Sequence, residues 1–215
     1  MIFDREEKHS MAKKLRKFWI TDIRIGKLKR KILLFLQKIY HFPAWNIAPI
    51  NDRPYAREIV CHIQKYVDKK KWCNIVEVGC GLGSIIGNIK DCGKRVGVDI
   101  NNTSIYVAKT LHPFVEFGTG SFKDVDIGKI DCLIMVNFIH RIPEDKLRDD
   151  VQILLAHNQV NLIVFDTFKN NRNTEYLYSH RGEYLLGDKY RLLRRSRGFR
   201  ASHGARRYIE YWEKI

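Results

Sequence analysis

The chain has 215 residues, 45% of them apolar, which is enough to build one α/β domain with an accessory segment. Its 39 Lys and Arg outnumber its 24 Asp and Glu, and the formal net charge of +15 favours binding to nucleic acid or to an anionic membrane surface. The five cysteines form no CxxC pair and no apolar stretch reaches about 18 residues, so we expect no zinc site, disulfide framework or membrane-spanning helix.

A basic segment comes first in the chain. Residues 1–10 contain three acids and no apolar core, so we expect no secretory signal peptide, and Met11 offers an alternative start. Residues 12–45 contain ten Lys or Arg and one acid. Apolar side chains recur there at helical spacing and predict an amphipathic helix that ends at Pro43: Leu28, Ile32, Phe35, Leu36 and Ile39. We therefore expect residues 1–45 to form a basic N-terminal helical segment ahead of one domain at 46–215.

The rest of the chain alternates between short apolar stretches and helical stretches. A linker with two prolines leads to a helix expected over 55–69. Nearly continuous apolar runs predict a parallel sheet with strands at 74–79, 94–99, 114–118, 131–137 and 160–166. Period-two alternation in the tail predicts an antiparallel hairpin, 190–195 with 207–212, turning near 202–204. The predicted fold is α/β: a Rossmann-like, mostly parallel sheet with an antiparallel C-terminal hairpin, preceded by the basic helical segment.

The first predicted strand runs into a glycine-rich loop, Gly79-Cys80-Gly81-Leu82-Gly83, with an acid at Glu77 and a helix expected at 84–90. Glycine lacks a Cβ, so the backbone turns sharply and a ligand can approach it closely. Ligands of parallel sheets bind beyond the carboxyl ends of the strands. Asp99 ends the second strand there, where a carboxylate can accept hydrogen bonds from a ribose diol. A dinucleotide-binding loop would need a third glycine at position 84, which is serine.

The stretch Glu77 to Gly83, together with Gly97-Val98-Asp99, resembles motif I and the acid that follows it in class I S-adenosylmethionine-dependent methyltransferases. The resemblance extends over about residues 73–168 and implies that S-adenosylmethionine is the cofactor. The residues that it places at this cofactor are Glu77, Gly79, Cys80, Gly81, Gly83, Asp99, Ile100, Ser121, Phe122 and Asn137. Ser121 and Phe122 stand where family members often carry an adenine-binding Asp. The Ser121 hydroxyl and the Phe122 ring offer a substitute, although Phe122 suits ordinary core packing equally well.

Three polar side chains are candidates for catalysis. A hydroxyl acceptor loses its proton as it attacks, usually to His, Asp or Glu. His140 follows the fourth strand in a loop that, in the family, lies beside the transferred methyl group, so it is the first candidate base. Substrate positioning and helix capping are its alternatives. Asp166, at the end of the fifth strand, and His180, in the insertion after it, are further candidates for the base or for substrate binding.

The acceptor is indicated by a second resemblance. Residues 45–55 and 202–212 resemble bacterial methyltransferases associated with surface polysaccharide synthesis, which implies a hydroxyl on a sugar or glycan precursor, or a sugar phosphate, as acceptor. Such an enzyme would be cytoplasmic, as the unpaired cysteines also suggest, and residues 12–42 would bind the anionic inner face of the cell membrane peripherally. The rival reading is that the apolar stripe packs on the domain and that the basic surface serves solubility.

Two other functions remain open from the sequence. In the first, the protein is an RNA methyltransferase whose basic arm and tail bind phosphates, although the chain lacks an RNP, KH or zinc-knuckle pattern. In the second, it is a non-catalytic adaptor of the same fold that binds a membrane or a partner protein. The intact glycines and Asp99 argue against this adaptor.

Overall fold

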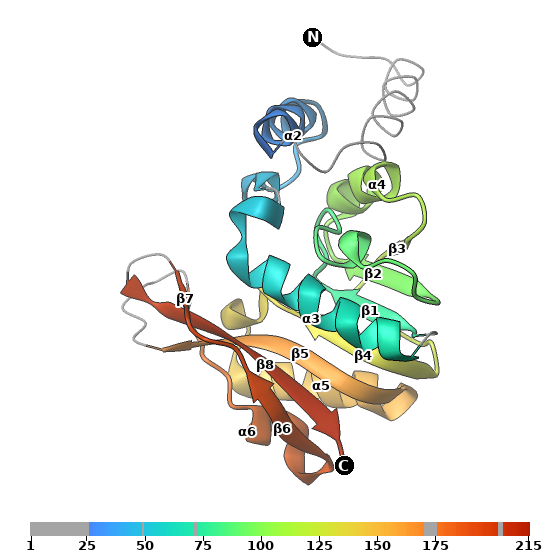
Figure 1. Cartoon of the computed structure of the whole chain (residues 1–215), viewed down its shortest axis with the longest axis vertical. Helices are drawn as coiled ribbons and strands as arrows, with labels where there is room; N and C mark the ends of the chain where they lie inside the picture. Colours follow the sequence, from blue (N-terminus) through green and yellow to red (C-terminus); the bar gives the residue numbers. More distant parts are fainter. Residues whose placement is uncertain (1–25, 49, 71–72, 170–175, 202–203) are drawn as a thin grey trace.

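The computed structural model describes residues 26–48, 50–70, 73–169, 176–201 and 204–215. The first part of the basic segment and most of the predicted 202–204 turn therefore lie outside the described residues. Eight strands of the described residues form one sheet, in the order β3-β2-β1-β4-β5-β8-β6, with β7 paired to β8 (Figure 1). The strands are β1 Ile75–Val78, β2 Arg95–Asp99, β3 Glu116–Thr119, β4 Lys129–Met135, β5 Gln159–Lys169, β6 Tyr190–Arg195, β7 Phe199–Arg200 and β8 Arg206–Lys214.

The pairing of the strands confirms the predicted fold class. Five neighbouring strands run parallel, because the chain crosses over between them and enters the sheet each time in the same direction: β3, β2, β1, β4 and β5. Strand β8 pairs antiparallel with both β5 and β6, so the tail hairpin extends the same sheet. In β1 every side chain is buried, as expected when helices cover both faces of a parallel sheet.

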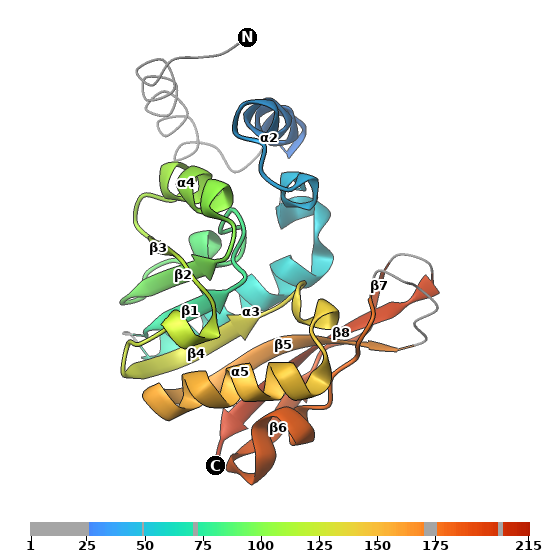
Figure 2. The same ribbon diagram turned by 180° about the vertical axis from the view of Figure 1, so that it is seen from behind.

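Two helical layers enclose the sheet. One face packs on α3 Pro54–Lys70 and α4 Asn102–Leu111, the other on α5 Glu144–His157 and α6 Gly182–Leu186. Helix α3 crosses the face turned to the viewer in Figure 1, and α5 crosses the opposite face in Figure 2. Short 3-10 turns fill the connections: η1 Ala44–Ile47, η2 Ile50–Asp52, η3 Ile86–Asn88, η4 Phe122–Asp124, η5 Ile139–Arg141 and η6 Gly187–Lys189.

The helix predicted over 84–90 is wrong, because the chain there forms turns and the single 3-10 turn η3. Gly83 has φ 72°, outside the helical range, and Gly87 adds a second residue with low helix propensity. The Glu77 carboxyl accepts the N–H of Ile86 at 2.9 Å, so a side chain replaces a carbonyl of the helix ladder.

The N-terminal helix α2 Gly26–Tyr40 packs on the domain through a face that coincides only in part with the predicted apolar stripe, since Ile32 contributes to it beside Leu36. Leu33 and Leu36 are buried and join a cluster with Leu82, Val107 and Leu111 beside α4. Phe35, which belongs to the predicted apolar stripe, is 46% exposed. Of the two readings of this stripe, packing on the domain therefore holds for Leu36 and not for Phe35. Within the described residues, no helix combines the length and the apolar character that crossing a bilayer requires.

We predict that Leu36→Ala lowers the free energy of unfolding by about 2–5 kcal/mol, because it leaves a cavity between α2 and α4. Phe35→Ala, one residue away on the exposed side, should change it by less than about 0.5 kcal/mol. Urea denaturation of the two variants measures both values. Equal effects of the two substitutions would contradict the packing of α2 described above.

Candidate functional site

The loop after β1 has a backbone that only glycine adopts easily. Gly79, Gly81 and Gly83 all have positive φ, at 68°, 54° and 72°. A Cβ on Gly79 would lie 2.4 Å from the Phe138 ring, and one on Gly81 would lie 2.6 Å from Asn46 Oδ1. Any larger residue at these two positions is therefore both strained and crowded.

Asp99, at the carboxyl end of β2, fastens this loop. Its Oδ2 accepts the N–H of Gly81 and its Oδ1 accepts the N–H of Asn101, each at 2.8 Å. A carboxylate has about four acceptor sites, so both oxygens can accept further hydrogen bonds from a ligand. The next residue, Ile100, is 80% exposed, which leaves an apolar surface open beside Asp99.

Glu77 is a buried acid directly under the glycine loop. The pKa of its carboxyl is raised to about 8, chiefly by burial; the hydrogen bond from Ile86 opposes this shift and the nearby Asp99 adds to it. At neutral pH the group is therefore largely protonated. A cationic ligand beside the loop would favour its ionised form.

Three other residues predicted to contact the cofactor are either buried or already hydrogen-bonded within the protein. Cys80 is buried and its thiol has a raised pKa, chiefly through burial, so it acts as a packing residue. Phe122 is 3% exposed and packs in the core, with its ring 5.9 Å from that of Phe138. Ser121 donates its N–H and its hydroxyl to Asp124 at 2.8 and 3.1 Å, which fixes the hydroxyl.

The linker before α3 lies across the glycine loop, which the sequence did not reveal. Asn46 Nδ2 donates to Ser104 Oγ at 3.3 Å while its Oδ1 faces Gly81. Arg53 donates to Ser84 Oγ at 3.3 Å and to the Trp45 carbonyl at 2.5 Å. These contacts hold the segment of η1 and η2 over the loop.

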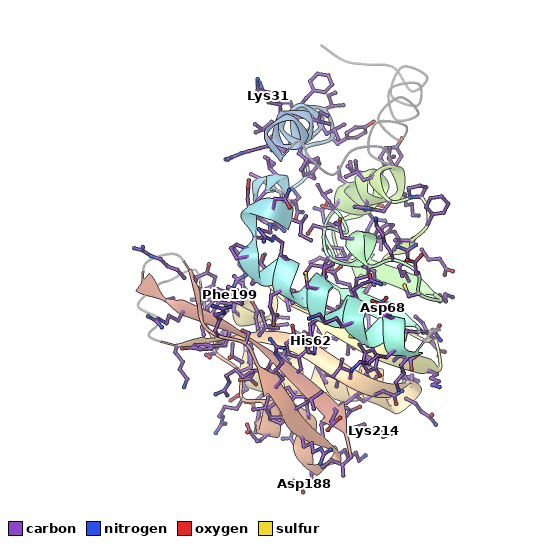
Figure 3. The ribbon with its side chains drawn as sticks, viewed as in Figure 1. Lys31, His62, Asp68, Asp188, Phe199 and Lys214 are labelled. Atoms are coloured by element: carbon purple, nitrogen blue, oxygen red, sulfur yellow. The ribbon has the colours of Figure 1, made fainter. Side chains whose placement is uncertain are left out.

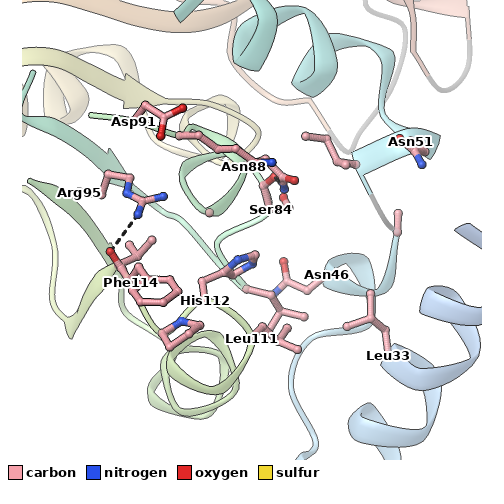
Figure 4. A pocket seen from close by; sticks show the side chains of 17 residues that line it. Leu33, Asn46, Asn51, Ser84, Asn88, Asp91, Arg95, Leu111, His112 and Phe114 are labelled. Carbon is pink, nitrogen blue, oxygen red and sulfur yellow. Dashed lines mark hydrogen bonds between the residues drawn. The ribbon is translucent and has the colours of Figure 1, made fainter. Parts of the chain in front are cut away.

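A cleft of about 420 Å³ lies behind this segment (Figure 4). Its labelled polar side chains include Asn46, Ser84, Arg95 and His112, and Leu33 of α2 closes one side. The cleft therefore borders the glycine loop on the side of Leu82 and Ser84, and its lining does not include Asp99.

The structure brings together the three candidates for catalysis, His140, Asp166 and His180. All three are buried. Asp166 accepts the N–H of Asn137 with both oxygens, at 3.1 and 3.2 Å. His180 Nε2 lies 2.8 Å from the Ile139 carbonyl, and because a carbonyl only accepts, this nitrogen carries the proton.

His140 is held in a neutral form. Its ring stands edge-on to Phe168 and Tyr176, with centroids 5.5 and 4.8 Å away. The pKa of His140 is lowered to about 4, chiefly by burial and also by the charges of Arg207 and Arg141. A neutral imidazole can accept a proton, but this low pKa makes it a weak base in the isolated protein.

Arg207, on β8, completes the cluster and was missed from the sequence. Its Nε lies 3.4 Å from Asp166 Oδ2, and its Nη2 donates to Asn137 Oδ1 at 2.9 Å. Its guanidinium carbon lies 4.1 Å from the centre of the Tyr55 ring. Nothing in the local sequence separates Arg207 from the neighbouring Arg206, because only the register of β8 with β5 turns one of them inward.

The buried Glu77 predicts a pH-dependent stability. The folded protein holds a proton on Glu77 up to about pH 8, whereas the unfolded chain releases it near pH 4.5, so stability is lost as the pH rises between these values. Glu77→Gln should remove this pH-dependent loss of stability. The loss amounts to about 1.4 kcal/mol for each unit by which the pKa is raised. Its advantage over the wild type should grow from pH 5 to 8.5 in urea denaturation. Parallel pH profiles for the two proteins would show that Glu77 is ionised without penalty.

Comparison with protein-family models and with curated protein sequences finds no match. Solved structures do resemble the chain. Magnesium protoporphyrin IX methyltransferase from Synechocystis PCC 6803 aligns with a TM-score of 0.60 over 98% of both chains, at 13% identity. The N-methyltransferase NodS from Bradyrhizobium japonicum WM9 aligns with a TM-score of 0.61 over 76% of this chain and 98% of its own, at 11% identity. The chain therefore has the fold of class I S-adenosylmethionine-dependent methyltransferases.

Proposed function

We propose that the protein transfers a methyl group from S-adenosylmethionine to a hydroxyl of a sugar or glycan precursor. The observation that supports this proposal is the glycine loop at the carboxyl end of the sheet. Its glycines have positive φ, and Asp99 accepts the N–H of Gly81. Two of the structural neighbours are crystallised with S-adenosylhomocysteine, and one with S-adenosylmethionine.

The residues around the loop fit this cofactor chemically. S-adenosylmethionine carries a ribose diol, an ammonium group and a positive sulfur, and it supplies an activated methyl group. Asp99 has lone pairs for the diol, and the bare backbone at Gly79 and Gly81 permits close approach. The buried Glu77 offers a carboxyl whose ionised form a cation would stabilise.

The chain's own contribution is then to hold the acceptor in place, which can supply about 7–11 kcal/mol of the barrier. The Asn137–Phe138 loop contacts Gly79 on one side and is held by Asp166 on the other. In this proposal His140 accepts the proton of the acceptor hydroxyl. Asp166 and His180 act as positioning residues, since each is already bonded to this loop.

A sugar acceptor is favoured by where the second sequence resemblance falls. The stretch 45–55 forms the segment across the glycine loop, and the stretch 202–212 carries Arg207. Both stretches thus border the same edge of the sheet. The structural neighbours include methyltransferases of magnesium protoporphyrin IX and of small RNA, so their substrates differ and do not select an acceptor.

An RNA acceptor is less well supported, because the arginines of β6 are already paired. Three of them form ion pairs with Glu213, Glu58 and Glu210, at 2.6, 3.0 and 2.7 Å: Arg191, Arg194 and Arg195. A paired arginine releases fewer counterions from a phosphate backbone than a free one. The intact glycine loop likewise argues against a non-catalytic adaptor.

We predict that the wild-type protein binds S-adenosylmethionine and that Asp99→Ala weakens binding at least about tenfold, because the diol loses a charged acceptor and Gly81 loses its anchor. Gly81→Val should abolish binding through its strained backbone and the contact with Asn46. Isothermal titration calorimetry measures both. Asp126→Ala, an exposed acid between η4 and β4, is the control and should bind normally. Unchanged affinity in a folded Asp99→Ala protein would contradict the proposal.

We also propose that the basic N-terminal segment holds the protein peripherally on the anionic inner face of the cell membrane. In the described part of this segment, Lys31, Leu34, Phe35 and Lys38 share the outer face of α2. Leu34 and Phe35 are 41% and 46% exposed. Apolar side chains flanked by lysines suit an anionic lipid surface, since both burial and charge attraction contribute.

Sedimentation with vesicles tests this proposal. Binding should rise with anionic lipid, fall with salt, and drop at least about tenfold in the Leu34→Ser/Phe35→Ser double variant. Leu192→Ser/Leu193→Ser is the matched control, with side chains 39% and 51% exposed on β6. Figure 3 places β6 near Lys214 and Asp188, at the opposite end of the molecule from Lys31 on α2. A full-length protein that ignores anionic vesicles at low salt would rule the membrane contact out.

A further inference from the structure

Buried polar atoms that make no hydrogen bond concentrate at one place in the described part of the chain, although one of them, Arg207 Nε, lies in the ion pair with Asp166. Five buried side-chain nitrogens there make no hydrogen bond: Arg95 Nε, His140 Nδ1, His180 Nδ1, Arg207 Nε and Arg207 Nη1. Four of the five belong to the cluster at the carboxyl ends of β4 and β5. Proteins rarely leave buried polar groups without partners, because each such group loses its hydration. A polar ligand at this cluster would provide the missing partners.

The guanidinium of Arg207 is the strongest donor in the cluster. It is 4% exposed, and its Nε and Nη2 are turned to Asp166 and Asn137. Its Nη1 has no partner. Aromatic rings surround the group, with centroids 4.1, 5.0 and 5.7 Å from its central carbon: Tyr55, Phe168 and Tyr176. The rings lie around the guanidinium, and Nη1 is the nitrogen for which a ligand would supply the hydrogen-bond partner.

We propose that Arg207 is the anion-binding residue of the acceptor site, and that the acceptor carries a carboxylate or phosphate near the hydroxyl that is methylated. This inference rests on the proposed methyl transfer at the same edge of the sheet. The planar guanidinium binds the oxygens of both anions well, in end-on or forked geometry. Tyr55 and Tyr176 are half-buried and border the site.

The position of His140 fits this arrangement. His140 and Arg207 contact the same pair of stacked rings, Phe168 and Tyr176, whose centroids lie 4.3 Å apart. An acceptor whose anion binds Arg207 therefore brings a neighbouring hydroxyl toward the imidazole. Positive charge from Arg207 and Arg141 acts on His140. An anion would offset this charge and make His140 a better base.

The test uses four probes: inorganic phosphate, glucose 1-phosphate, glucuronate and the neutral methyl glucoside. Their binding is measured by calorimetry at constant ionic strength, with and without saturating S-adenosylhomocysteine. At least one anionic probe should bind, and Arg207→Met should weaken it by about tenfold or more, the loss of one charged hydrogen bond. Arg206→Met removes the same charge from the exposed neighbouring position and should leave the affinity unchanged. The methyl glucoside should respond to neither substitution.

The two phosphates and glucuronate separate a phosphate acceptor from a carboxylate acceptor. If Arg207→Met does not fold, as judged by circular dichroism, Arg207→Lys replaces it. Lysine keeps a cation beside Asp166 but lacks the planar fork, so anion affinity should still fall. The inference is overturned if no anionic probe binds at its highest soluble concentration, or if the probes bind the Arg207 variant as tightly as the wild type. Binding of S-adenosylhomocysteine, read in the same titrations, decides the proposed function separately.

Discussion

The carboxylate of Asp166 fixes the loop on which the acceptor side of the site depends. Its two oxygens hold the N–H of Asn137, a residue with φ 70° in the left-handed region. That conformation costs a residue with a side chain roughly 1–2 kcal/mol, so the surrounding contacts must compensate for it. Because Asn137 is held in this way, the Phe138 ring lies on Gly79. One buried acid on β5 thereby positions the loop after β4 against the loop after β1.

Two other acids at strand ends do the same for the cofactor side. Glu77 holds the N–H of Ile86, and Asp99 holds those of Gly81 and Asn101. In each case a carboxyl near a strand end accepts a backbone N–H of a loop or turn. The cost is electrostatic, since the buried Glu77 carries a pKa of about 8 and the charge of Asp99 contributes to it.

The sequence predicts features that depend on a short stretch of residues. It does not predict which side chains the pairing of distant strands or helices turns inward. Continuous apolar runs predict the five parallel strands, and the glycines with Asp99 predict the loop, because both signals lie within short stretches. The buried side of α2 is predicted only in part: Leu36 lies in the predicted stripe and is buried, whereas Leu33 is buried outside the stripe and Phe35 is exposed. All three residues are apolar, so only the contact with the domain separates them. Arg207 is missed for a related reason: the pairing of β8 with β5 turns it inward.

The two halves of the site differ in charge, because the strand ends supply different groups. On the glycine-loop side Glu77 and Asp99 stand close together and favour a cation. On the β5–β8 side the one acid, Asp166, is matched by Arg207, and both histidines have an unpaired nitrogen. A cationic donor and an anionic acceptor would each lower the electrostatic cost of its own half. They would also attract each other across the Asn137–Phe138 loop, which favours occupancy of the two halves together.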